Sequence, residues 1–203
     1  MKNGQNNNEL KVPSDSKYIP FTQQYYLCVP TCFQMIMYRH NVPLLPAELI
    51  GEELGLVIPE KDKKYFWNAT VGKQHISGYG TNITKFPPDN FFLKYKLPFS
   101  FRKFLSSTFK TKKEFKDLIE KFSKEDLDIL MCFDSGTLEK DSSLTWGHVC
   151  LIDKIEGEKV RLIDPDFDAP KWRIVDMEDL YNAVIVHGDK KDGGIWIMEY
   201  LKK

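Results

Sequence analysis

The second half of the chain consists of short apolar runs separated by turns, and this pattern limits the fold more than any other feature. The runs at 147–155 and 159–163 flank Glu156-Gly157-Glu158, a pattern typical of a β-hairpin. Two further runs, at 128–133 and 194–201, predict additional strands. Helical patterns dominate the chain before these strands, so the order of elements predicts an α+β fold with an antiparallel sheet.

The most informative helical pattern begins at Cys28. Over 28–40 the apolar residues recur with helical spacing, at Cys28, Cys32, Met35 and Ile36. Pro30 falls in the first turn, where a missing backbone N–H costs nothing. Cys28 is therefore predicted at or just before the N-terminus of a helix. Three more helices are predicted, at 46–54, 111–122 and 176–184.

The length of 203 residues is sufficient for one domain with a sizeable core. Residues 1–17 are polar and are predicted to be disordered or to form an extended N-terminal arm. Residues 18–203 are predicted to form a single domain. Within it, residues 57–107 show no sustained periodicity, which indicates an inserted lobe or a substrate-side loop region.

The charge balance gives no reason to expect a nucleic acid or an anionic membrane as partner, because Lys plus Arg and Asp plus Glu each number 29. The basic, aromatic stretch at 85–113 is interpreted as a solvated face. No apolar run reaches the roughly 20 residues needed to span a bilayer. No secretory signal is recognised, so we expect a cytoplasmic bacterial protein, or a secreted one if a signal has been removed.

The predicted hairpin brings a histidine close to an aspartate. If its turn centres on Glu156, residues whose numbers sum to 312 face each other, and His148 lies opposite Asp164. The same register pairs Cys150 with Leu162, Ile152 with Val160, and Asp153 with Lys159. A carboxylate beside the imidazole would fix its tautomer. A slip of one residue would put the two side chains on opposite faces.

Cys28, His148 and Asp164 together fit a nucleophile, a base and a group that orients the base. The dipole at a helix N-terminus favours the thiolate form of a cysteine placed there. A side-chain amide from Gln23 or Gln24 could join the Cys28 backbone N–H in stabilising an oxyanion. Gly147, next to the histidine, indicates a close approach of another group to the backbone.

Other interpretations of these residues are less specific. Cys32, Cys132 and Cys150 lie in apolar patterns and are interpreted as buried thiols, since four cysteines are few for a disulfide scaffold. Zinc could in principle be bound, but no CxxC pair is present, so neither a metal nor another cofactor is predicted. The ligands for zinc would be Cys28, Cys32, His148 and Cys150. Three histidines lack a supporting constellation: His40, His75 and His187.

The segment from Gln23 to Cys32, with Met35-Ile36 after it, resembles the start of the bacteriocin-leader-processing (double-glycine) branch of papain-like cysteine peptidases. That branch has a Gln, a few residues, Cys-Gly-Pro-Ala and then a hydrophobic helix. Trp146-Gly147-His148-Val149 and Ile163-Asp164-Pro165 resemble its Gly-His and Asp-Pro motifs, in the same order. The resemblance implies a papain-like fold in which the nucleophile helix packs on the antiparallel sheet.

The resemblance also implies a thiol-dependent hydrolase that cleaves a peptide or related amide bond, often after small residues. Cys28 would be the nucleophile, His148 the base, Asp164 its orienting group and Gln23 the oxyanion residue, favoured over Gln24 by spacing. Trp146 and Tyr26 are predicted to bind substrate.

The chain departs from the family pattern at Val29, where glycine is usual, and this change is expected to alter the oxyanion turn or to narrow the cleft. Two alternatives follow from the same residues: a catalytically inactive binding module, and an acyltransferase using the same triad.

Overall fold

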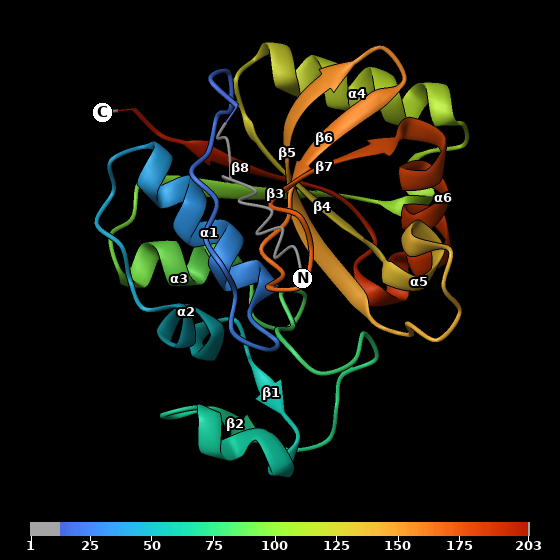
Figure 1. Cartoon of the computed structure of the whole chain (residues 1–203). Helices are drawn as coiled ribbons and strands as arrows, with labels where there is room; N and C mark the ends of the chain where they lie inside the picture. The colour runs from blue at the N-terminus through green and yellow to red at the C-terminus, as the bar shows by residue number, and fades with distance from the viewer. Residues whose placement is uncertain (1–12, 203) are drawn as a thin grey trace, which may run out of the picture.

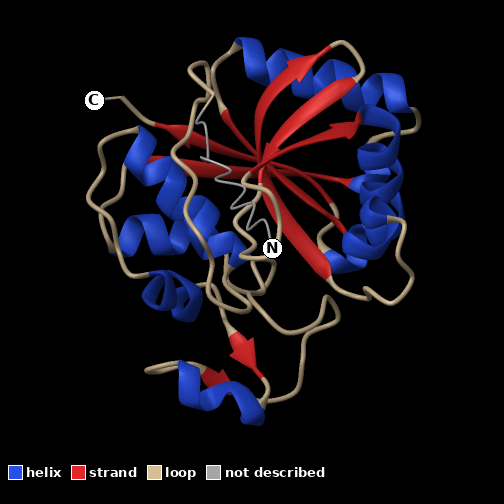
Figure 2. Cartoon of the chain, in the orientation of Figure 1, coloured by secondary structure: helices blue, strands red, loops and turns tan. Residues whose placement is uncertain are grey.

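The computed structural model describes residues 13–202, and its central element is a six-stranded antiparallel sheet (Figures 1 and 2). The strand order is β3-β8-β4-β5-β6-β7. The strands are β3 (Phe99–Leu105), β4 (Asp128–Asp134), β5 (Gly147–Glu156), β6 (Lys159–Ile163), β7 (Trp172–Asp176) and β8 (Gly194–Tyr200). The helices are α1 (Cys28–Arg39), α2 (Ala47–Glu53), α3 (Pro88–Lys94), α4 (Lys112–Lys124), α5 (Ser135–Glu139) and α6 (Met177–His187).

Helices cover both faces of the sheet (Figure 1). On one face, α1 and α3 pack against the sheet through buried residues such as Phe33 and Phe92, which share an apolar cluster with Leu151. On the other, α4 and α6 form a second cluster that includes Phe115 and Leu180. The α+β fold with the Cys28 helix packed on an antiparallel sheet is confirmed by this arrangement.

The segment 57–107 does not form one inserted lobe. Strands β1 (Val57–Ile58) and β2 (Thr70–Val71), with the 3-10 turn Glu60–Tyr65, extend from the body as a small unit (Figure 1). In contrast, α3 packs in the core and β3 is an edge strand of the main sheet, paired with β8. Long, aromatic-rich stretches without clear periodicity concealed these two elements in the sequence.

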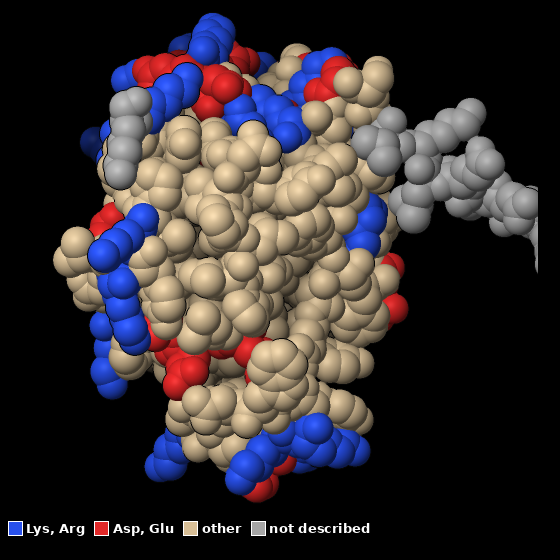
Figure 3. Space-filling model, turned by 90° about the vertical axis from the view of Figure 1, so that its left-hand side faces the viewer, with Lys and Arg blue, Asp and Glu red and all other residues tan. Residues whose placement is uncertain are grey.

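The body and this small unit, called the lobe below (residues 57–80), meet along α2. Glu48 Oε2 accepts a hydrogen bond from the Trp67 N–H at 2.7 Å, and Glu52 Oε1 accepts one from Asn68 Nδ2 at 3.0 Å. On the face shown in Figure 3, acidic side chains gather where the lobe joins the body, whereas Lys and Arg lie at its outer end. Polar contacts therefore help to hold the lobe in place.

The predicted hairpin forms, but its register differs from the predicted one. Glu156 pairs with Lys159 across a two-residue turn in which Gly157 has a φ of 62°. The turn is thus centred one and a half residues later than expected. Ile155 pairs with Val160 and Ile152 with Leu162, so the predicted pairs Cys150–Leu162, Ile152–Val160 and Asp153–Lys159 are wrong.

Of the predicted N-terminal arm, residues 1–12 lie outside the described residues. Residues 15–17 lie against β5 and β6, where Asp15 forms ion pairs with Lys154 and Arg161. None of the helices within residues 13–202 is both long and apolar enough to cross a membrane.

Candidate active site

A cavity of about 570 Å³ opens between the start of α1, the start of β5, the loop after β6 and the lobe. Its lining includes five of the residues singled out from the sequence: Gln23, Tyr26, Cys28, Trp146 and His148. Asp164 is fully buried directly behind the histidine. The fold thus brings the sequence-predicted residues from three separate segments to one place.

Cys28 is the first residue of α1, as the sequence predicts. Among the described residues no side chain caps this helix end, and the Leu27 N-cap position offers only backbone. The first-turn N–H groups of an α-helix have no partner within the helix, and they carry the positive end of its dipole. The half-buried Cys28 sulfur therefore lies where a negative charge is stabilised.

His148 and Asp164 form a buried hydrogen-bonded pair, with 2.7 Å between His148 Nε2 and Asp164 Oδ1. The second carboxylate oxygen, Oδ2, accepts from Arg173 Nη1 at 2.9 Å. Oδ1 also accepts from the backbone N–H of Asp166 at 2.9 Å. A buried carboxylate is tolerated when its oxygens are satisfied in this way.

The pKa values of the pair move apart. Burial works against the charged imidazole, but interactions with Cys150, Asp164 and Cys28 outweigh it and raise the pKa of the histidine well above its usual value. Burial works likewise against the carboxylate. The His148 bond and charge, the Asp166 N–H and Arg173 nevertheless hold the pKa of Asp164 well below its usual range. The pair therefore favours an imidazolium beside a carboxylate.

The ring orientation leaves Nδ1 of His148 available to the nucleophile. Because Nε2 faces Asp164, Nδ1 is the ring nitrogen left for another partner, and an interaction with Cys28 is among those that raise the pKa of the histidine. A thiol and an imidazole in this relation can exchange a proton. An aspartate on the far nitrogen fixes the tautomer that makes the exchange productive.

The sequence analysis placed Asp164 directly opposite His148, and this pairing is wrong. Leu151 pairs with Ile163, so the continuing register sets Asp164 opposite Cys150 and diagonal to His148. The contact itself is confirmed by the 2.7 Å hydrogen bond, because the two side chains share a face of the sheet. They share it owing to a β-bulge between Ile152 and Lys154.

Cys150, which the sequence analysis interpreted only as a buried thiol, also lies beside the pair. One ligand atom each from His148, Cys150 and Asp164 all lie within 4.8 Å of one another. Burial raises the pKa of Cys150 to about 12, so it is a protonated thiol near neutral pH. The His148–Asp164 separation is that of a hydrogen bond, and a metal ion between them would have to break it.

The two glutamines face different surroundings. Gln23 lines the cavity, and its backbone N–H donates to the Pro165 carbonyl at 2.8 Å, which fixes it beside Asp164. Its Oε1 is buried without a hydrogen-bond partner among residues 13–202. The amide group of this side chain can donate a hydrogen bond through Nε2. Gln24 instead donates its Nε2 to the Tyr65 carbonyl of the lobe.

Aromatic side chains form the rim of the cavity. Trp146 is 50% exposed, and Tyr26 packs edge-on against Tyr79 of the lobe at 5.9 Å between ring centroids. The Tyr26 hydroxyl donates to Asp62 at 2.6 Å. With a φ of 67°, Tyr26 holds a backbone conformation that non-glycine residues rarely adopt, two residues before Cys28. It links the lobe to the nucleophile.

His187, for which the sequence offered no role, also lines the cavity. It is the last residue of α6 and is 4% exposed. A Cβ added to Gly147 would lie 2.3 Å from its Cε1, so this ring is the group that approaches the backbone beside His148. In the sequence, Gly147 indicated that some group approaches the backbone here. It could not identify that group as His187, which is 40 residues away along the chain.

His187 is expected to make the protein sensitive to acid. Burial, with the Lys191 charge, lowers the pKa of His187 to about 4. As pH falls below ~6.5 the unfolded chain therefore takes up this proton first, and folded-state stability is lost until pH ~4. Between pH 7 and 4.5, the wild type should lose about 2–3 kcal/mol more unfolding free energy than His187→Leu. Urea denaturation at both pH values measures this, and parallel losses would contradict it.

Comparison with solved structures identifies the architecture. The chain superposes on the crystal structure of a protein from Bacillus anthracis described as a "putative C39-like peptidase", with a TM-score of 0.54. The match covers 92% of this chain and 96% of the other, at 14% sequence identity. The fold is that of a C39-like, papain-fold peptidase. No protein-family model and no curated protein sequence matches the chain.

Proposed function

We propose that this protein is a cysteine peptidase or amidase with Cys28 as nucleophile, His148 as acid–base group and Asp164 as its orienting partner. The observation that carries the proposal is that one cavity is lined both by Cys28, at the uncapped start of α1, and by His148, which is hydrogen-bonded to the buried Asp164 behind it. Trp146 and Tyr26 contact the substrate at the rim. The peptidase fold is consistent with each of these assignments.

In the first half of the reaction the Cys28 thiolate attacks the carbonyl carbon of the substrate amide. The resulting oxyanion accepts hydrogen bonds from the Cys28 backbone N–H and from Gln23 Nε2. The C–N bond breaks as the imidazolium of His148 donates its Nδ1 proton to the leaving amine. In the second half His148 takes a proton from water, which attacks the thioester and releases the acid and the thiolate.

Val29 supports a second candidate, a binding module that retains the fold without catalysis. This residue lines the cavity next to the nucleophile and is 4% exposed, so its side chain occupies space that a glycine would leave open. The two candidates differ in the reactivity of the thiol. A catalytic Cys28 reacts through its thiolate with assistance from His148, whereas an inert one does not.

The alkylation rate of Cys28 against pH separates these candidates. Iodoacetamide labelling, followed by mass spectrometry, is expected to stay fast down to pH ~6 in the wild type and to fall at least about tenfold in His148→Ala. Cys132, which also lines the cavity, is an internal control because burial raises its pKa well above the usual value. Labelling that appears only near pH ~8.5 and is indifferent to His148 would contradict the catalytic assignment.

A further inference from the structure

The β-bulge in β5 is built around a buried aspartate. On the turn side of the bulge, Lys154 pairs with Arg161, and on the active-site side Ile152 pairs with Leu162. Asp153 is therefore the extra residue, and it is 2% exposed. A carboxylate is a costly residue at such a position unless its oxygens are bonded.

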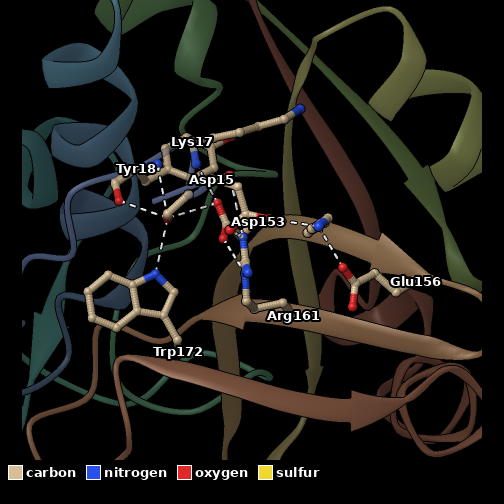
Figure 4. A network of polar contacts seen from close by, with 9 residues as sticks. Asp15, Lys17, Tyr18, Asp153, Glu156, Arg161 and Trp172 are labelled. Atoms are coloured by element: carbon tan, nitrogen blue, oxygen red, sulfur yellow. Dashed lines mark hydrogen bonds and ion pairs between the residues drawn. The ribbon is translucent and has the colours of Figure 1, made fainter. Parts of the chain in front are cut away.

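The partners of Asp153 come from the N-terminal strap, defined as residues 15–17, and from the next strand (Figure 4). Oδ1 accepts from the Lys17 backbone N–H at 2.7 Å and from Ser16 Oγ at 3.0 Å. Oδ2 accepts from Arg161 Nε at 2.6 Å. Both oxygens are satisfied, so the carboxylate holds the bulge and the strap together.

The strap is fixed on its other side as well. Asp15 Oδ1 accepts from Arg161 Nη2 at 3.0 Å, and Asp15 Oδ2 pairs with Lys154 Nζ at 2.7 Å. Trp172 Nε1 of β7 donates to Ser16 Oγ at 3.0 Å. The strap thus spans three neighbouring strands at the bulge, as Figure 4 shows.

The bulge changes which face of the sheet each residue of β5 occupies. Before it, Cys150 and Ile152 belong to the apolar cluster under α4 and α6, and after it Ile155 packs against the same cluster. The partner strand β6 keeps its alternation, with Val160 and Leu162 in that cluster. The bulge therefore shifts β5 by one residue against β6, and a shift of one residue exchanges the faces.

We propose that Asp153 is a positioning residue for the His148–Asp164 pair, acting through this bulge. If the turn-side pairing continued without the bulge, Asp164 would face Leu151 and lie on the opposite face from His148. Asp153 and the strap hold β5 and β6 in the register that brings the carboxylate to the imidazole. This inference rests on the proposed function of the pair, but it concerns residues that do not touch the cavity.

The test uses the pH profile of Cys28 alkylation in the folded fraction of each variant. In Asp153→Ala, His148-dependent labelling at pH ~6 should fall at least about tenfold, because the orienting carboxylate is displaced. Asp153→Asn keeps an acceptor for the Lys17 N–H, so its labelling rate should fall less than that of Asp153→Ala. If Asp153→Ala does not fold, Asp153→Asn takes its place in the test.

The matched control is Asp128→Ala. Asp128 is also a buried aspartate on a strand, 1% exposed, and it bonds Tyr18, Arg39 and His40. Its strand pairs there without an irregularity. Asp128→Ala should lower the melting temperature comparably while leaving the alkylation profile of the folded protein unchanged. A purely structural role for Asp153 would make the two aspartates behave alike.

A second readout keeps the test independent of catalysis. The hydrogen bond between His148 and Asp164 should give a downfield imidazole N–H proton resonance, present in the wild type and Asp128→Ala and lost in Asp153→Ala. If wild-type Cys28 itself labels slowly at pH ~6, the proposed function fails, and this resonance alone decides the positioning role. If Asp153→Ala keeps both the wild-type resonance and the wild-type labelling, the positioning role is overturned and the proposed function stands.

Discussion

Replacing Cys28 with alanine should reduce amide hydrolysis by at least about 10³-fold, because no other group in the cavity can take over covalent attack. The remaining cysteines of the chain are poor substitutes. Burial holds the pKa of Cys32 and Cys132 well above the usual value and raises that of Cys150 to about 12. The loss should appear without unfolding, since Cys28 is only half-buried and the change removes a single sulfur.

The measurement uses a pool of synthetic peptides of known sequence, with new N-termini counted by mass spectrometry. Cys132→Ala is the matched control, because Cys132 lines the same cavity but is expected to keep activity within about threefold. Cleavage by Cys28→Ala at the wild-type rate would contradict the nucleophile assignment. Repeating the reaction in ¹⁸O-water separates hydrolysis, which labels the new C-terminus, from acyl transfer to an added amine, which does not.

The sequence predicted the parts of the site that local patterns determine. The helical spacing of apolar residues and Pro30 in the first turn are local features, and α1 begins at Cys28 as expected. The two apolar runs around a glycine predicted the hairpin, and the His148–Asp164 hydrogen bond confirms that its strands bring these residues together. The structural match bears out the papain-like fold.

The sequence could not predict features that depend on distant segments. The predicted hairpin register was wrong, yet His148 and Asp164 still meet. They do so because the later turn and the bulge together return the two side chains to the same face of the sheet. The bulge is held by Asp153, whose partner Lys17 lies 136 residues away. His187 meets Gly147 through the packing of α6, and α-helical periodicity says nothing of which strand its last residue will touch. Such features follow from tertiary contacts that no local spacing encodes.

Gly147→Ala should lower both the stability and the activity of the protein. An added Cβ would lie 2.3 Å from Cε1 and 2.5 Å from Nε2 of His187, so either the ring or the β5 backbone must move. Overpacking of this kind costs about 1–3 kcal/mol. Because Gly147 precedes His148, a backbone shift also displaces the imidazole, and a misplacement of about 1 Å can reduce the rate about 100-fold. Urea denaturation and the peptide-pool assay measure the two effects separately.

A double-mutant cycle identifies the cause. If the clash with the imidazole ring is responsible, His187→Ala should restore most of the stability that Gly147→Ala loses, giving a coupling energy of about 1–2 kcal/mol. Gly72→Ala is the control, because its added Cβ meets only Val57 at 3.6 Å, an ordinary contact. Strictly additive losses would instead assign the damage to the backbone of β5. If the double variant recovers stability but not activity, His187 itself contributes to the cleft, because its imidazole ring is absent from that variant.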